Sequence, residues 1–451
     1  MAPAGLDFLT DKYDERYWSW ATTKFAVVQP HPSWSGVVMT ETGLARLAVK
    51  ASTFFSRTEP RIFDLRILGA FHIALFLGAI WLMLAGTRDL AVPVQLLIAV
   101  LLVVVFTDVG YAASFNSLYG QTASLLFFLW VVALTALAVR DGRLDDGLLI
   151  GFFLCAALFV ASKPQECVQG PILALLGVRL AGGFSGKRLW RQPAIYLAAG
   201  LCAFAVWYYF QTPRRAIRDV ARYHTVFMDL LPNSPNPAAD LRELGLDEDL
   251  LRYSGVHAYM PAAPLGDPGF EERFFARFGF RKLLVFYLAH PARLYDRVRR
   301  ASHRAFRLRP ATLGNFERIS GQPARAQSSR HSLWSTLRLA FGSRGLLWLA
   351  LILGGTAFAV LWRIGAVSGR ERLFREALLA LVVMACLEFV VCAFADYLDD
   401  LPRHLFAFHV MFDLILIVDS AWLAQVAWAR FHAREHVRFD RINVASREGV
   451  E

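Results

Sequence analysis

The sequence is poor in cysteine and lacks the short motifs of many metal, redox and nucleotide-binding proteins. Its five cysteines include no CxxC pair, and four of them lie inside apolar runs, where we expect inert packing residues. No disulfide framework can therefore be read. P-loop and GxGxxG sequences are also missing, and no Ser/His/Asp arrangement is convincing. The sequence thus lacks the common signatures of nucleotide-binding proteins and serine hydrolases.

Lysine is also scarce, because only 6 of the 48 basic residues are lysines and the other 42 are arginines. The net charge is +11. Arginine suits phosphate groups through the bidentate fork of its guanidinium group. A nucleic-acid-binding motif is missing. The charge thus favours an anionic lipid membrane or a phosphorylated ligand, and we expect no nucleic-acid partner.

Apolar residues, in contrast, make up 56% of the chain, and the mean hydropathy is +0.40. They form separate runs that are long enough to cross a bilayer. We predict an all-α, multi-pass integral membrane protein with about nine transmembrane helices. The expected spans cover residues 67–85, 90–107, 118–139, 147–162, 168–183, 193–210, 345–362, 377–395 and 405–428. The fourth and fifth are near the lower length limit for spanning.

The basic residues of the short loops predict an orientation. One alternate set of loops, with the C-terminal tail, carries 15 basic residues, whereas the opposite set carries only Lys163 and Arg403. The positive-inside rule then places the C-terminus in the cytosol and residues 1–64 outside. No span precedes this external segment. We therefore expect either that a first helix is missing from this chain start or that the first span drives insertion with the N-terminus outside.

The predicted organisation has five parts. They are an external segment with an acidic motif (1–64), a first bundle of about six spans (65–210), a large external loop (211–344), three last spans (345–428) and a basic cytosolic tail (429–451). Within the large loop, a basic stretch near 272–309 has apolar residues at helical spacing. We predict an interfacial helix that lies on anionic headgroups and helps to seat a lipid donor. The alternative is a core helix of a small soluble domain.

A polar gap interrupts the apolar sequence at residues 106–121, which read FTDVGYAASFNSLYGQ. Its candidate ligand-binding residues are Asp108, Asn116, Tyr119 and Gln121. A solvated loop would usually carry more charge. The gap is therefore interpreted as the floor of a site for a neutral, hydroxyl-rich or lipid-linked ligand. The alternative is a membrane hairpin whose polar groups cap helices and satisfy its own backbone.

Three more segments supply charged and amide groups on the same predicted side. TDKYDERYW holds Asp11, Asp14 and Glu15; SKPQECVQ holds Lys163 and Gln165; ADYLDDLPRH holds Arg403. A carboxylate can deprotonate an acceptor hydroxyl, and a cation can neutralise a leaving phosphate. Amides and aromatic rings can hold a sugar. These groups are what a transferase that uses a lipid-phosphate donor needs.

Ionisable residues also occur inside the last apolar runs, where they are costly and usually face a cavity or a partner. They are Glu388, His409, Asp413 and Asp419. His409 and Asp413 are one helical turn apart and could pair. We interpret this set as polar contacts between the last two spans rather than as a proton path.

The polar segments resemble elements of the GT-C superfamily of polyprenyl-phosphate-sugar-dependent glycosyltransferases, multi-pass enzymes whose first external loop carries an acidic catalytic motif. TDKYDERYW is similar to that motif, and RIFDLRILGAFHIALFLGAIWL is similar to the arginine-bearing second helix. FNSLYGQ resembles the asparagine/glycine/glutamine element of mannosyltransferase-like members, and SKPQ resembles the lysine–proline element. LDDLPRHLFAFHVMFDLIL resembles the late arginine-bearing loop and last helix. The resemblance implies that Asp14 or Glu15, with Asp11 as runner-up, activates the acceptor. It also implies that Lys163 and Arg403 contact the donor phosphate. The alternatives are a solvated acidic turn and arginine or lysine snorkelling at helix ends.

The sequence therefore predicts a hexosyltransferase of GT-C type in a bacterial inner membrane. It would move a sugar from a polyprenyl-phosphate sugar donor to an envelope glycan or lipid acceptor on the external face. The alternatives are a non-catalytic transporter of lipid-linked glycans and an accessory protein of envelope polysaccharide synthesis. The sequence names no cofactor, and it neither requires nor excludes a divalent cation.

Overall fold

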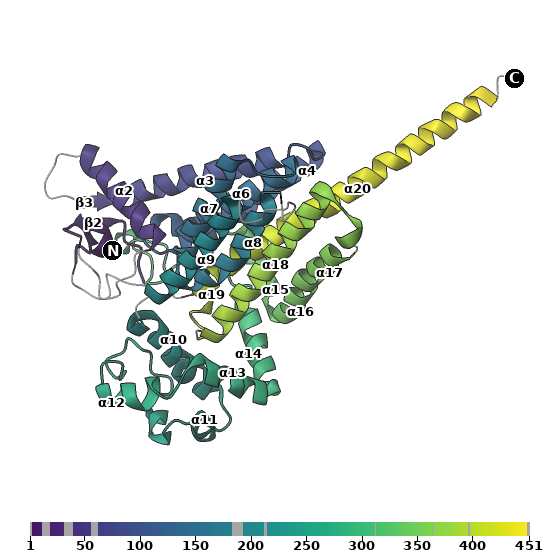
Figure 1. The fold of residues 1–451 in the computed structure, drawn as a ribbon. Coiled ribbons are helices and arrows are strands. Elements are labelled where there is room, and N and C mark those ends of the chain that lie inside the picture. Colours follow the sequence, from purple (N-terminus) through teal and green to yellow (C-terminus); the bar gives the residue numbers. More distant parts are fainter. Residues whose placement is uncertain are drawn as a thin grey trace.

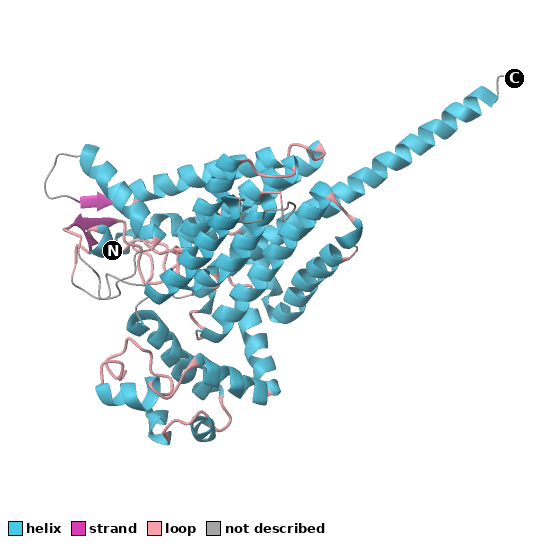
Figure 2. Cartoon of the chain, viewed as in Figure 1, coloured by secondary structure: helices cyan, strands magenta, loops and turns pink. Residues whose placement is uncertain are grey.

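The protein is a helical bundle with a small sheet at one end and a separate helical lobe, as seen in a computed structural model (Figure 1). The structure describes residues 2–10, 19–30, 39–55, 62–182, 193–211, 214–311, 313–362, 364–395 and 397–448, with the side chains of the last helix described as far as residue 431. In Figure 2 the described chain is almost entirely helix and loop, with three short strands near the N-terminus. The predicted all-α membrane fold class is confirmed.

The N-terminal part forms a three-stranded antiparallel sheet in the order β1–β2–β3. The strands are β1 (Leu6–Asp7), β2 (Lys24–Val27) and β3 (Ile62–Asp64), and the helix α2 (Thr40–Phe55) lies between β2 and β3 in the sequence. Phe25 pairs with Phe63 in the register, and both side chains are buried in one hydrophobic cluster with Ala48 of α2. The segment therefore has its own small core, which fixes it on the bundle.

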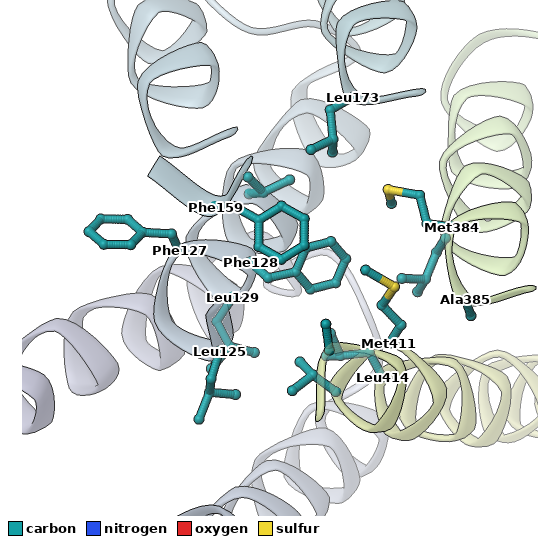
Figure 3. Packing of buried hydrophobic residues seen from close by; sticks show 14 of the residues in the cluster. Leu125, Phe127, Phe128, Leu129, Phe159, Leu173, Met384, Ala385, Met411 and Leu414 are labelled. Atoms are coloured by element: carbon teal, nitrogen blue, oxygen red, sulfur yellow. The ribbon is translucent and has the colours of Figure 1, made fainter. Parts of the chain in front are cut away.

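The bundle contains the helices that carry the predicted spans. They are α3 (Arg66–Gly86), α4 (Val92–Phe106), α5 (Val109–Ala112), α6 (Gln121–Asp141), α7 (Asp146–Val160), α8 (Gly170–Leu180), α9 (Pro193–Gln211), α15 (Leu333–Phe341), α16 (Gly345–Leu349), α17 (Gly355–Leu361), α18 (Gly369–Ala395) and α20 (Phe406–Glu448), with the short α19 (Leu401–His404) before the last. Helix α6 is the most buried of the candidate spans. Figure 3 shows its Phe128 against Phe159 of α7, with Met384 and Met411 from α18 and α20 beside them.

All nine predicted runs are helical, but fewer qualify as membrane spans. Among the described residues, six helices are long and apolar enough to cross a membrane, and the bent pair Val92–Phe106 and Val109–Asn116, with a bend of 53°, makes a seventh if it is one span. Helices α7 and α8 have only 15 and 11 residues. They are short because the polar turn at 161–169, which contains the short helix η3 (Pro164–Gln169), separates them. The expected nine is thus reduced to six or seven.

A helical lobe below the bundle in Figure 1 is formed by residues 214–304. Its helices are α10 (Val220–Tyr223), α11 (Pro237–Glu243), α12 (Pro268–Phe270), α13 (Phe280–Ala289) and α14 (Pro291–Arg304), joined by single turns and loops. A separate aromatic core holds them together and includes Tyr223, Phe227 and Phe274. The lobe thus buries its own apolar surface.

The stretch predicted as one interfacial helix is divided in two. Leu283 and Tyr287 of α13 are buried in the core of the lobe, whereas Leu284 and Leu288 are exposed. Pro291 then starts α14, a helix rich in arginine whose buried Arg297 forms an ion pair with Asp229. The alternative of a core helix therefore holds for the buried face of α13, while contact with lipid headgroups stays a prediction.

The intramembrane acids also differ from the sequence interpretation. Each contacts an element outside the last two spans: Gln165 of η3 donates to Glu388, Arg338 of α15 pairs with Asp413, and Thr356 of α17 donates to Asp419. A buried carboxylate must be compensated by hydrogen-bond donors or a cation. Tertiary packing, rather than sequence spacing, decides which donors lie next to it. The predicted contacts between α18 and α20 through these acids are therefore wrong, although their role as polar contacts within the bundle holds.

The loops between helices meet at two ends of the bundle. At one end, Thr40 N–H donates to the Ala161 carbonyl (2.9 Å), Ala21 N–H to Phe316 (2.9 Å) and Val109 N–H to His331 (2.8 Å). At the other end, Arg370 pairs with Asp89 (3.0 Å). The N-terminal segment, the polar gap, η3 and α19 thus share one end.

Candidate functional site

A cavity of about 530 Å³ lies at the end of the bundle where the polar loops meet. Its walls come from the N-terminal segment, the turn between α5 and α6, residues 308–327, and α19. The polar and aromatic side chains that line it include Trp20, Thr23, Asn116, Tyr119, Gln121, Arg309, Asn315, Glu317, Gln327 and Arg403. Among its described residues, the cavity therefore combines neutral hydrogen-bonding groups and rings with two guanidinium groups and one carboxylate.

Three residues predicted from the polar gap lie together on one wall. Asn116 closes the short turn after α5, Tyr119 is 40% exposed, and Gln121 begins α6. A Cβ atom at Gly69 of α3 would overlap the Asn116 side-chain oxygen, so the glycine lets the asparagine pack directly against the helix. These amide and phenol groups are placed to hydrogen-bond a neutral ligand.

Asp108, in contrast, lies apart from this wall and is occupied by backbone contacts. It is almost fully buried. Its Oδ1 accepts a hydrogen bond from Gly110 N–H (2.8 Å) and its Oδ2 from Ser335 N–H (2.9 Å). One carboxylate thus caps the first turns of both α5 and α15, which satisfies donors that would otherwise be buried without partners. The structure assigns Asp108 a capping position rather than a cavity-lining one.

Residues 308–327 form a wall that the sequence interpretation did not include. Arg309 donates to the Asn315 side chain (3.4 Å), and Gln327 donates to the Pro310 carbonyl (2.6 Å). The hydroxyl of Thr23 donates to Glu317, which ties this loop to the N-terminal segment. Burial lowers the pKa of Arg309, and the charge of Asp108 opposes this shift. A long stretch of Pro, Gly, Asn and Gln without apolar periodicity was the available signal, because such loops in compact folds are often functional.

Arg403 lines the cavity from α19 and is held by Asp400. Its Nε donates to Asp400 Oδ1 (2.9 Å), its Nη2 forms an ion pair with Oδ2, and His404 Nε2 lies 3.2 Å from the same oxygen. Burial by itself raises the pKa of Asp400, but the hydrogen bonds and charges of His404 and Arg403 outweigh burial and hold the pKa well below its usual value. The Arg403 guanidinium is therefore fixed at the edge of the cavity by an ionised partner.

Lys163 and Gln165 belong to a second polar cluster behind the turn. Gln165 Nε2 donates to Glu388 Oε1 (2.5 Å) and to the His404 carbonyl (2.9 Å), so it joins α18 to α19. The Lys163 ammonium is buried and makes no hydrogen bond within the described part of the chain. Neither residue lines the cavity. The predicted pair of phosphate contacts, Lys163 and Arg403, is thus divided between two places.

The predicted acidic residues Asp11, Asp14 and Glu15 lie outside the described residues. The residues on both sides of that segment are described. Phe8 and Trp20 both line the cavity, and the Ser19 carbonyl accepts a hydrogen bond from Arg325 N–H (2.9 Å). Phe8 and Trp20, which lie on either side of that segment, therefore both belong to the cavity wall.

The arrangement suits an uncharged polar group next to an anion. Amides and aromatic rings bind hydroxyl-rich ligands, while arginines bind phosphate through paired donors. Among the side chains described, no group of three or more His, Cys, Asp or Glu is placed to hold a metal ion. Whether the protein uses a divalent cation therefore stays open, as it was from the sequence.

Comparisons with known proteins place the chain in a family. A search of curated proteins gave no match, and neither did a search of solved structures. The family model described as YfdI N-terminal transmembrane domain matches residues 1–441, which is nearly the whole chain. Together with the six or seven candidate spans, this match shows that the chain is an integral membrane protein and belongs to the YfdI N-terminal transmembrane domain family.

Proposed function

We propose that the protein is a membrane glycosyltransferase that takes a sugar from a polyprenyl-phosphate donor and transfers it to an envelope glycan or lipid acceptor. The observation that supports this most is the cavity, because neutral hydrogen-bonding and aromatic groups share it with Arg309 and Arg403. A sugar phosphate presents the matching chemistry of hydroxyl groups next to an anion. The cavity also lies at an end of the bundle, so a lipid chain can stay in the bilayer while its headgroup occupies the site.

In the proposed reaction, a carboxylate takes the proton of the acceptor hydroxyl. The acceptor oxygen forms a bond to C1 of the sugar while the bond from C1 to the phosphate oxygen breaks. Polyprenyl phosphate leaves with the bonding electrons, and a guanidinium group neutralises its growing charge. Asp14 or Glu15 is the proposed base, as the resemblance implies. Glu317 is a second candidate, since it is the carboxylate among the described lining residues.

The proposal is tested with the purified full chain in phosphatidylcholine nanodiscs. A panel of radiolabelled polyprenyl-phosphate hexoses is added with an extract of envelope glycolipids, and label transfer and donor binding are measured separately. We expect transfer with one donor. The variants Asp14→Asn, Glu15→Gln and Glu317→Gln each replace one candidate base. The variant that removes the true base should lower kcat on the order of 10²-fold and keep donor binding.

Arg309→Gln should weaken donor binding, since it removes a cation next to the phosphate. Glu248→Gln in the lobe, which removes an exposed carboxylate far from the cavity lining, is the matched control and should leave transfer unchanged. Donor binding without transfer in every combination would instead favour an accessory protein or a transporter of lipid-linked glycans. Absence of donor binding would contradict both the glycosyltransferase and the non-catalytic alternatives.

A further inference from the structure

A second hollow, of about 390 Å³, lies on the other side of the segment that carries Arg309. It is lined by Arg299, Arg300, His303, Arg304, Arg307, Leu339, Gly342, Ser343 and Leu398. Arg307 lines this hollow and Arg309 lines the cavity, with the buried Leu308 between them. The two spaces are therefore separate, although one stretch of chain serves both. We call the second one the basic pocket.

The basic pocket has more positive charge than its neighbours neutralise. Asp296 pairs with Arg299 (2.7 Å) and Arg300 (2.9 Å), and Asp399 pairs with Arg304 (2.8 Å). Among the described residues, four arginines thus meet two carboxylates, which leaves an excess of two positive charges before His303 is counted.

Several donors of this pocket have no partner in the described chain. Arg300 Nη1 is buried without a hydrogen bond. The side chains of Arg307 and His303 make no hydrogen bond or ion pair in the part of the chain that the structure describes. Guanidinium groups in a concave site without enough carboxylates are typical of phosphate binding.

The pocket borders a candidate membrane-spanning segment. Gly342 and Ser343 belong to the turn Gly342–Arg344 that precedes α16, within the candidate span Leu333–Ala366. Leu339, Leu347 and Leu351 on this segment are 52%, 50% and 55% exposed, as expected for side chains that face lipid. Cationic groups thus border an apolar, exposed helix surface, which is the arrangement that a phospholipid needs for its headgroup and its acyl chains.

Close backbone contact fixes the two walls of the pocket relative to each other. Figure 1 shows α14 meeting the bundle at α16, and the two helices are in contact. A Cβ atom at Gly345 would overlap the Ser302 carbonyl oxygen, so only glycine lets α14 come this near. The cations of α14 are therefore held at a constant depth relative to the start of α16.

From these observations we infer that the basic pocket binds the phosphate of an anionic membrane lipid. The headgroup occupies the pocket between α14 and the turn before α16, and the acyl chains follow the exposed leucines of the candidate span Leu333–Ala366. This site is distinct from the cavity of the proposed glycosyl transfer, and it holds whether or not the cavity transfers a sugar.

The test is native mass spectrometry of the full chain released from nanodiscs. One set contains phosphatidylcholine alone, a second adds phosphatidylglycerol, and a third adds polyprenyl phosphate. We expect one retained anionic lipid per chain and no retained phosphatidylcholine. Arg307→Glu should weaken retention about tenfold or more, because one surface cation contributes roughly 1 kcal/mol to binding an anionic lipid and the reversal also adds repulsion.

Two variants make the result specific. Arg307→Lys keeps the charge and should retain most of the lipid, and Arg252→Glu, at an exposed arginine of the lobe, should behave as the wild type. Thermal unfolding of each variant shows that it is folded. Retention of either anionic lipid that depends on Arg307 supports the site, and the second and third sets identify the preferred source of the phosphate. Equal retention by Arg307→Glu and wild type, or equal retention of phosphatidylcholine, would overturn the inference.

Discussion

At the scale of single residues, the buried carboxylate of Asp413 is held by several hydrogen bonds. Asp413 is fully buried and accepts from the Tyr111 hydroxyl (2.6 Å), the Trp334 indole N–H (2.8 Å) and the Arg338 guanidinium (3.1 Å). Removing one partner of such a pair typically costs about 3–5 kcal/mol, because the remaining charge is left without compensation. The network therefore fixes α15 against α5 and α20, and with them the cavity wall.

Asp400 gives a pH-dependent prediction. Because the folded-state pKa of Asp400 lies below its usual value of 3.8, the ionised carboxylate adds stability above that value, and this stability is lost as the pH falls from 3.8 towards the folded-state pKa. Asp400→Asn should therefore reduce the free energy of unfolding at pH 7 by about 2 kcal/mol. The difference from wild type should stay constant down to about pH 5 and shrink below 3.8. Thermal unfolding in detergent, followed by tryptophan fluorescence, measures it.

The matched control is Asp249→Asn in the lobe. Asp249 pairs with Arg273 at the surface, where its side chain is 48% exposed, so its loss should cost less than about 1 kcal/mol. If Asp400→Asn matched the wild type at pH 7, or if the difference grew below pH 4, the role of the Arg403 and His404 contacts would be wrong.

At the scale of elements, two turns beside the site are in close backbone contact. A Cβ atom at Gly120, directly before α6, would overlap the Ser162 carbonyl oxygen and approach the Lys163 side chain. Backbone cannot move aside as a side chain can. We therefore expect Gly120→Ala to separate the turn of Tyr119 from η3, with a loss of roughly 1–3 kcal/mol in stability.

Gly200→Ala is the control for this substitution. Gly200 lies within α9, and a Cβ atom there would meet nothing within 4 Å. Alanine favours a helix over glycine by up to about 1 kcal/mol, so this variant should be as stable as the wild type or more stable. Unfolding temperatures of both variants in the same detergent decide the matter. Equal behaviour would show that the two turns do not depend on each other.

At the scale of the whole molecule, the shared end of the bundle predicts a shared side of the membrane. Gln322 lies in the cavity-end loops and Arg143 in a loop at the opposite end; both are exposed. From the positive-inside rule we expect Gln322 outside and Arg143 in the cytosol. Single cysteines at these positions, in a chain whose five native cysteines are replaced, are labelled in intact cells with an impermeant maleimide.

Labelling at position 322 alone, with position 143 labelled only after permeabilisation, is the expected result. The reverse pattern would place the cavity in the cytosol, where an external acceptor could not reach it. Labelling of both positions in intact cells would contradict the bundle arrangement itself, because the two loops lie at opposite ends of the same helices.

The sequence by itself determined the class of protein and the positions of its helices along the chain. Long apolar runs need a bilayer or a core, and the backbone inside a bilayer must satisfy its own hydrogen bonds, so helices at these positions follow from composition and length. The polar gap at 106–121 was visible because polar residues interrupt an apolar pattern. Asn116, Tyr119 and Gln121 were found in this way, and all three line the cavity.

Only the tertiary structure decided which polar groups meet. Asp108 and Gln121 look alike in the sequence, yet one caps two helices and the other lines the cavity, because the approach of Ser335 from α15 cannot be read from local spacing. Arg309 and Glu317 lie in a loop without periodicity, and their place depends on contacts with residues about 200 to 300 positions away. Long-range packing therefore assembled the candidate site from segments that the sequence could only name separately.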